Sequence, residues 1–167
     1  MKPDRPLCLL TREDVHVIAE LYGRSEEYFL LQDGEPAGLS DACDLFADLP
    51  PEKTMQDQAV FGCRGLQGLD AVAAILHDYP SGGVFYLGFL LVDPAARGMG
   101  LGRSVYAAIE SWAADRGACE IRLAVLDVNV SAARFWRSIG FQQRRRVGPD
   151  RFKSRMHHRI ELSRQIG

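Results

Sequence analysis

Long hydrophobic runs are missing from this sequence. No stretch approaches the roughly 20 apolar residues that a membrane-spanning helix needs. The first 14 residues, MKPDRPLCLLTRED, also lack the apolar core of a secretory signal peptide. We therefore expect a cytoplasmic protein with no membrane partner.

Cysteine is scarce and follows no pattern. The chain has no CxxC pair and no cysteine–histidine spacing of the kind that holds a metal. Its four cysteines are Cys8, Cys43, Cys63 and Cys119. We expect free thiols in a reducing compartment and no bound metal.

Internal repeats, linkers and low-complexity tracts are also absent. A chain of 167 residues with 47% apolar and 25% charged residues is large enough to bury its own core. We expect residues 1–167 to form a single domain.

Charge is divided unevenly along the chain. Residues 1–60 carry 13 acidic and 5 basic side chains, a net charge of −8. Residues 134–167 carry 10 basic and 2 acidic side chains, a net charge of +8. This asymmetry indicates either a charged partner or two ends of the chain that lie beside each other.

The most informative stretch is VFYLGFLLVDPAARGMGLGRS, residues 84–104. Its first nine residues, Val84–Val92, are apolar or glycine and predict a strand buried on both faces. Asp93-Pro94 ends this strand, because proline cannot donate to the sheet ladder. The glycine-rich turn Arg97–Gly102 then leads into a helical pattern. A strand, a glycine turn and a helix N-terminus together make a phosphate-binding site.

Two familiar phosphate motifs do not match this turn. A Walker loop closes with Gly-Lys-Ser/Thr, whereas this turn closes with Gly102-Arg103-Ser104. A dinucleotide fingerprint needs G-x-G-x-x-G, and the glycines at 98, 100 and 102 have a different last spacing.

The remaining patterns predict an alternation of helices and strands. In the first third of the chain we expect a strand over 6–10, a helix over 15–23, a helical turn or loop over 25–31 and a helix over 40–49 capped by Ser40. Strands over 59–65, 69–77 and 84–92 follow, and then a helix that ends at Gly117. In the last third we expect a strand over 120–128, a helix capped by Asn129 or Ser131 and ended by Gly140, and strands over 142–147 and 156–163 joined by a polar loop.

Two motifs carry a resemblance to a known family. Arg97-x-x-Gly100-x-Gly102 resembles motif A of the GCN5-related N-acetyltransferases (the GNAT superfamily), Arg/Gln-x-x-Gly-x-Gly/Ala. The segment from Asn129 to Phe141, N-x-x-A-x-x-F-W-x-x-x-G-F, resembles the helix that follows the fifth strand of that family. Residues 49–53 and 77–80 resemble a bacterial subgroup of these enzymes.

The resemblance implies the acyl-CoA N-acyltransferase fold. This is an α/β (α+β) fold with a mixed, mostly antiparallel central sheet flanked by helices, in which the fourth and fifth strands splay apart. It also implies acetyl-CoA as co-substrate, with the pyrophosphate on the glycine turn and the pantetheine between the splayed strands. The residues expected to bind it are Leu90, Leu91, Val92, Arg97, Gly98, Met99, Gly100, Leu101, Gly102, Arg103, Ser104, Asn129, Ala132 and Phe135.

Two positions depart from the pattern of the family. Trp136 stands where the family usually has a tyrosine that protonates the thiol, and an indole N–H is not a practical proton donor. Gly88 stands where an acidic residue often lies, four positions before the last valine of the strand. Trp136 is therefore expected to pack in the core.

Other residues are candidates for the catalytic roles. Tyr86, predicted to share a strand face with Gly88, is a candidate acid, although it could equally be a core aromatic. Asp78, next to His77, could act as a base through water or could simply shape a turn. The backbone N–H of Leu91 or Val92 is a candidate for polarising the thioester carbonyl.

The resemblance also implies that the acceptor side lies within residues 11–60, because the first two helices of this fold and the loop between them cover it. Glu26 and Glu27 would attract a cationic amine, and Tyr28 and Phe29 would add apolar surface. These carboxylates could instead solubilise a helix or pair with the basic C-terminal strands.

These observations predict an acetyl-CoA-dependent N-acetyltransferase that acts on a small amine or a protein amino group, as a monomer or homodimer. The alternative is a CoA-binding regulatory module that has lost the chemistry. A third reading, nucleic-acid binding by Arg144-Arg145-Arg146, is disfavoured because strand alternation divides that run between two faces and the chain is acidic overall. We expect no nucleic-acid partner.

Overall fold

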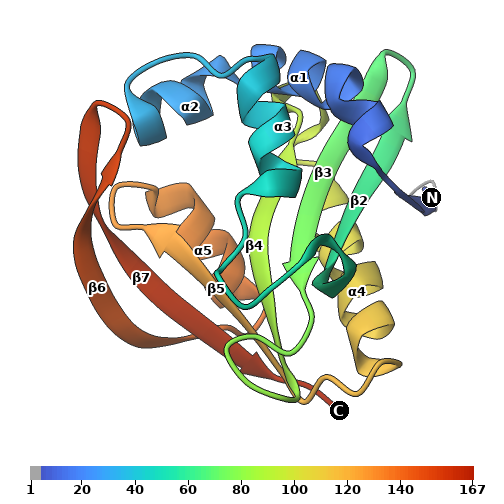
Figure 1. Ribbon diagram of the computed structural model, residues 1–167, viewed down its shortest axis with the longest axis vertical. Coiled ribbons are helices and arrows are strands. Elements are labelled where there is room, and N and C mark those ends of the chain that lie inside the picture. Colours follow the sequence, from blue (N-terminus) through green and yellow to red (C-terminus); the bar gives the residue numbers. More distant parts are fainter. Residues whose placement is uncertain (1–4) are drawn as a thin grey trace.

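A computed structural model describes residues 5–167 of the protein (Figure 1). Seven strands form one sheet in the order β1-β2-β3-β4-β5-β7-β6. The strands are β1 Leu7–Leu9, β2 Gln58–Gly65, β3 Gly68–Leu76, β4 Val84–Val92, β5 Glu120–Leu126, β6 Gln142–Phe152 and β7 Arg155–Gln165. All neighbouring strands are antiparallel except β4 and β5, which are parallel. The predicted mixed sheet is confirmed.

Within the described residues, five α-helices flank the sheet on both faces (Figure 1). They are α1 Val15–Arg24, α2 Glu26–Asp33, α3 Leu39–Ala47, α4 Leu101–Ala114 and α5 Val130–Ser138. Residues of α1, α2 and α3 form one core with β2, β3 and the end of β4, and residues of α4 and α5 form a second core on the opposite face. No helix within residues 5–167 has the length and apolar character needed to cross a membrane.

The sheet opens between β4 and β5. Their backbones pair at three positions, Val84 with Glu120, Phe85 with Ile121 and Tyr86 with Arg122. Beyond this joint the two strands diverge, which confirms the expected splay. The second half of β4 therefore has a partner on the β3 side and an open edge on the β5 side.

A bulge at Gly88 changes which face each residue of β4 meets. Ala74 pairs with Phe89 and Ile75 with Leu87, so Gly88 is the extra residue. Phe85 and Leu87 pack in the α4 core, and after the bulge Leu90 packs there as well. Continuous burial of β4 on both faces was therefore a wrong prediction: its first half is buried, whereas Gly88 is exposed.

Three other boundaries differ from the predictions. Helix α2 continues to Asp33, where a loop was expected. Helix α3 begins after Gly38 rather than Ser40, because the Asp41 carboxylate accepts a hydrogen bond from the Gly38 N–H. Strands β6 and β7 have 11 residues each and meet at a tight turn, whereas shorter strands and a polar loop were expected.

The turn between β6 and β7 docks on α2 (Figure 1). Both the N–H and the hydroxyl of Ser154 donate to the Asp33 carbonyl, at 3.2 and 2.8 Å. The Lys153 ammonium lies 2.7 Å from Asp41 and 3.4 Å from Glu35. The hairpin thus connects the β5–β7–β6 part of the sheet to helices that pack on the other part, across the point where the two parts separate.

Candidate active site

A cavity of about 900 Å³ lies at the splay between β4 and β5. Its walls come from the second half of β4, from β5 and from the inner sides of α2 and α3. Phe152 and Lys153 of the β6–β7 hairpin line it too. The cavity thus extends from the open edge of β4 to the helices on which the hairpin docks.

Two residues at the open edge of β4 direct their backbone groups away from β3. The Asp93 N–H donates to the Asp70 carbonyl of the β3 side at 2.8 Å. Because antiparallel pairs alternate, Leu91 also directs its N–H towards its β3 partner Val72. The backbone groups of Leu90 and Val92 consequently point away from β3. The Leu90 N–H and carbonyl and the Val92 N–H can pair with an extended ligand, whereas the Val92 carbonyl accepts from Arg97 and the Leu91 N–H is used within the sheet.

The glycine turn stands at the N-terminus of α4. Gly98 and Gly100 have φ values of +79° and +81°, which favour glycine over residues with a side chain. A Cβ on Gly102 would lie 3.4 Å from the Phe135 ring, so glycine lets α4 approach α5 closely. Arg97, Gly98 and Met99 are exposed, and the first N–H groups of α4 lack helical partners. The turn therefore retains the properties of an anion site.

Ion pairs connect this turn to the N-terminal helices. The Arg24 Nε donates to the buried Asp93 carboxylate at 2.7 Å, which ties α1 to the end of β4. Arg97 donates to the Val92 carbonyl at 3.0 Å and to Glu27 of α2 at 2.9 Å. Two predicted site residues, one for the cofactor and one for the acceptor, are therefore paired with each other.

The second motif lies across the cleft on α5. The Asn129 side chain caps this helix by accepting from the Ala132 N–H at 3.2 Å, and both residues line the cavity. Trp136 also lines it, and its ring packs edge-on against Tyr106, Phe135 and Phe141. The indole is thus both a core residue and part of the cavity wall.

Tyr86 and Gly88 lie together on the cavity wall. Tyr86 packs edge-on against Tyr79, with ring centroids 5.6 Å apart. Burial raises the pKa of the Tyr86 hydroxyl, so the group stays protonated at neutral pH. A Cβ on Gly88 would come no closer than 4.0 Å to the Ala74 carbonyl oxygen, so this glycine leaves open space in the wall.

Asp78 and His77 lie outside the cavity wall. The Asp78 carboxylate accepts from the Gly83 N–H at 2.7 Å and lies 2.9 Å from the His77 Nδ1. The His77 ring stacks on Phe85 at 4.4 Å. These contacts organise the turn between β3 and β4.

The acceptor residues predicted on α2 separate into two pairs. Tyr28 and Phe29 line the cavity, and burial raises the pKa of Tyr28 to about 12. Glu26 and Glu27 are exposed and do not line it. The acidic lining comes instead from α2 and α3, through Asp33, Asp41, Asp44 and Asp48.

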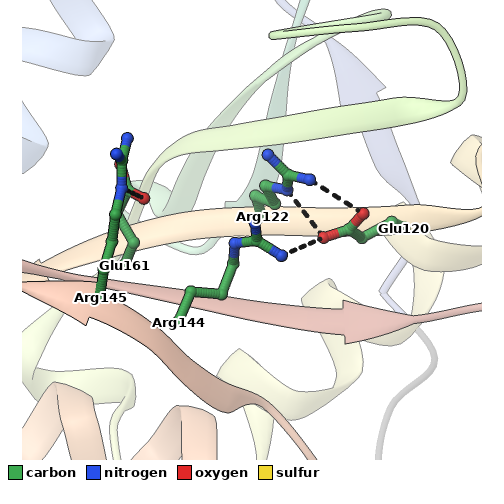
Figure 2. Close-up of polar contacts among 5 residues, drawn as sticks. All are labelled: Glu120, Arg122, Arg144, Arg145 and Glu161. Atoms are coloured by element: carbon green, nitrogen blue, oxygen red, sulfur yellow. Dashed lines mark hydrogen bonds and ion pairs between the residues drawn. The ribbon is translucent and has the colours of Figure 1, made fainter.

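A group of charged residues on the cavity floor was not predicted from the sequence. Arg122 of β5, Arg145 of β6, and Arg159 and Glu161 of β7 all line the cavity. Figure 2 shows Arg122 and Arg144 converging on Glu120, and Arg145 beside Glu161. A sequence signal existed: Glu120, Arg122 and Ala124 occupy alternate positions of a strand whose other residues are apolar, which indicates a face outside the core.

Within the part of the chain that the structure describes, no group of three or more His, Cys, Asp or Glu side chains is arranged to hold a metal ion.

Comparison with known proteins places the chain in a family. The model of the Acetyltransferase (GNAT) family matches residues 11–141. No curated protein matches the sequence. The chain belongs to the GNAT acetyltransferase family, whose members use acetyl-CoA.

Solved structures share the fold at low sequence identity. An acetyltransferase from Thermus thermophilus superposes with a TM-score of 0.77 at 23% identity, over 96% of this chain and 97% of that chain. The ribosomal-protein-S18-alanine N-acetyltransferase from Escherichia coli gives 0.70 at 18% identity, over 97% and 94%. An N-acetyltransferase from Staphylococcus aureus gives 0.73 at 13% identity, over 96% and 97%. At these identities the likeness establishes the acyl-CoA N-acyltransferase fold.

Proposed function

We propose that this protein is an N-acetyltransferase that transfers the acetyl group of acetyl-CoA to a primary amine. The observation that carries the proposal is the junction of the cavity with the glycine turn. A free strand edge at Leu90 and Val92, an anion site at the N-terminus of α4 and a large cavity all meet where β4 and β5 separate.

The groups of this chain fit the parts of acetyl-CoA. The N–H groups of the turn and of the first residues of α4, Gly98–Arg103, suit a pyrophosphate, because they combine positive backbone dipoles with φ values at Gly98 and Gly100 that a side chain would disfavour. Leu90 offers its backbone N–H and carbonyl, and Val92 its N–H, to the amides of pantetheine. Asn129, Ala132 and Phe135 on α5 supply the opposite side of the cleft.

Acetyl-CoA supplies an activated acyl group, so the chain needs to position the acceptor and manage charge. The amine nitrogen forms a bond to the carbonyl carbon, the C–S bond breaks, the nitrogen loses a proton and the departing thiolate gains one. The Val92 N–H can stabilise negative charge on the carbonyl oxygen. Tyr86, kept protonated by burial, is a proton donor within the cavity.

The acidic row on α3 supports a positively charged amine, on a small molecule or at the end of a peptide. Asp41 and Asp44 of α3, with Asp48 directly after the helix, line one wall. A wall of one sign raises the local concentration of ligands of the opposite sign.

A CoA-binding regulatory module is the second candidate. Trp136 and Gly88 favour it, because neither residue can donate or accept a proton in the reaction. The two functions differ in one measurement: release of free CoA thiol in the presence of an amine occurs for the enzyme and does not occur for the module.

Calorimetry on Gly100→Asp tests the cofactor site. The substitution places a carboxylate at the start of α4, and it puts a side chain on a residue whose φ of +81° is strained for any residue but glycine. The affinity for acetyl-CoA should therefore fall roughly a hundredfold. Gly82→Asp is the matched control, because it adds the same charge at an exposed turn where a Cβ meets nothing within 4 Å. Equal affinity of wild type and a folded Gly100→Asp variant would refute the proposed site.

A further inference from the structure

Arginines form the cavity floor opposite the acidic helix wall. Arg122, Arg145 and Arg159 come from the three strands β5, β6 and β7, and each lines the cavity. These three arginines pair with the carboxylates of Glu120, Glu161 and Asp150, and Arg144, which does not line the cavity, also pairs with Glu120. This network of ion pairs therefore carries one more positive than negative charge.

A bulge in β6 produces this surplus. Gln143 pairs with Leu162 and Arg145 with Glu161, so Arg144 is an extra residue in the strand. Both Arg144 and Arg145 consequently turn towards the β5 and β7 side chains, as Figure 2 shows. Strict alternation would have placed them on opposite faces.

The ion pairs orient the arginines without using all their donors. Glu120 accepts from the Arg122 Nε at 2.7 Å and from its Nη2 at 3.3 Å. Glu161 accepts from the Arg145 Nε and Nη2 at 2.5 and 3.2 Å. The guanidinium groups of Arg122 and Arg145 are thus each held in a bidentate pair that leaves Nη1 available to a ligand, whereas Arg159 contacts Asp150 through Nε alone.

Arg122 is the best placed of the three. Its side chain is 23% exposed, whereas that of Arg145 is 68% exposed. It sits at the joint of the sheet, where its backbone pairs with that of Tyr86. A guanidinium that is fixed and largely removed from water interacts with an anion more strongly than one on the surface.

The facing wall has the opposite sign. On α3, Asp41 pairs with Lys153, whereas Asp44 and Asp48 make no ion pair within residues 5–167. A purely cationic ligand would meet the arginines of the floor, and a purely anionic one would meet these aspartates. A ligand with both charges satisfies both surfaces.

We propose that the acceptor is a dipolar amine, one that carries an anionic carboxylate or phosphate group as well as its amino group. Arg122 binds the anionic group, with Arg145 and Arg159 beside it, and the amino end lies towards Asp44 and Asp48. This inference rests on the proposed acetyltransferase function and names the substrate class of the same cavity.

Acceptor pairs matched in size test the inference. Thiol release is measured with L-amino acids, with their carboxamides, which lack the anionic group, and with aminoalkyl phosphates. We expect kcat/KM to be at least tenfold higher for the anionic member of each pair. Carboxylates and phosphates are separate arms, so the preferred anion is identified by the same screen.

Substitution of Arg122 locates the anion site. Arg122→Gln should raise KM for the anionic acceptor about tenfold, the loss of one charge-assisted pair, with kcat and the KM for acetyl-CoA unchanged. Arg122→Lys should recover part of the affinity. Arg144→Gln is the matched control, because Arg144 also pairs with Glu120 but does not line the cavity. In this variant the KM for the anionic acceptor should change less than twofold.

Each outcome has a definite meaning. If carboxamides and amino acids react equally well, or if Arg122→Gln and Arg144→Gln behave alike in folded protein, the network is structural and the inference is wrong, while the acetyltransferase function stands. If no amine of any charge releases thiol although acetyl-CoA binds, the proposed function fails and the inference fails with it.

Discussion

Glu120 is the carboxylate on which the charged floor depends. It begins β5, opposite Val84 at the joint of the sheet, and its side chain is 11% exposed. Hydrogen bonds from Arg122, followed by the charges of Arg122 and Arg144, hold its pKa below the ordinary value of a glutamate despite the opposing effect of burial. Its ionised form therefore stabilises the folded protein.

Glu120→Gln should destabilise the protein in a pH-dependent way. At pH 7 we expect a loss of about 2 kcal/mol, because two arginines lose their shared partner. For a chain of this size, this corresponds to a fall in Tm of roughly 4–8 °C. Because the folded-state pKa is lowered, the stabilisation is complete above the ordinary glutamate pKa and disappears as the pH falls through the folded value. Thermal melts of wild type and variant should converge in acid.

The exposed Glu13→Gln substitution is the control for that experiment, and it should leave Tm unchanged at every pH. A Glu120→Gln deficit that is independent of pH would mean that the carboxylate contributes by shape alone.

The roles of single residues differed in how well they could be predicted from the sequence. Gly100 and Asn129 could be assigned because their roles are local: one needs a positive φ and the other caps the helix that it precedes. The role of Arg122 depends on Glu120, Arg144 and the opening of the sheet, which are contacts between separate strands. The distribution of charge on the floor could not be read from sequence spacing.

At the scale of elements, the β6–β7 hairpin depends on a close approach to α2. Gly34 ends α2 with a φ of +77°, and a Cβ there would lie 2.2 Å from the Ser154 hydroxyl. His157 of β7 also contacts the end of α2, where its Nε2 lies 2.9 Å from the Gln32 carbonyl oxygen. Glycine at position 34 is therefore a condition for docking.

Gly34→Ala should release the hairpin from α2. The positive φ alone costs about 1–2 kcal/mol, and the added methyl group displaces Ser154. We expect faster amide hydrogen exchange over residues 150–157 and a raised KM for the acceptor. Gly38→Ala, at a position where a Cβ meets nothing within 4 Å, should change neither. Unaltered exchange in Gly34→Ala would show that the hairpin holds its position without this contact.

The elements themselves were largely predictable, and their irregularities were not. The bounds of β4 follow from its apolar run and from Asp93-Pro94. The bulge at Gly88 does not follow from the sequence. In the structure this glycine has neither a positive φ nor a crowded Cβ, so nothing about the position requires glycine. The length of β6 was underestimated because Gly148 and Pro149 indicate a loop, whereas the structure places them at an irregularity within the strand.

At the scale of the whole molecule, the two oppositely charged ends of the chain meet. Lys153, in the basic C-terminal segment, pairs with Asp41 and Glu35 in the acidic N-terminal segment. The interpretation that the ends lie beside each other is thereby confirmed. Attraction between the segments contributes to closure of the cavity.

Salt should weaken this attraction. Raising KCl from about 20 to about 300 mM shortens the screening length to less than about 8 Å, so we expect Tm to fall by a few degrees, roughly 1 kcal/mol. Lys153→Met should have a lower Tm at low salt and a flatter dependence on KCl. A Tm that rises with KCl, or equal slopes for the two proteins, would contradict this account.

The length of the docked hairpin also limits the size of the cavity that we propose to hold the acceptor. Its strands have 11 residues each, at about 3.4 Å per residue, so its reach is a property of its own length. Removing two residues from each strand would preserve which side chains face inwards while withdrawing the turn by about 7 Å from α2. Insertions or deletions in this one hairpin can therefore enlarge or open the cavity without altering the glycine turn, so the size of the acceptor can evolve independently of the recognition of acetyl-CoA.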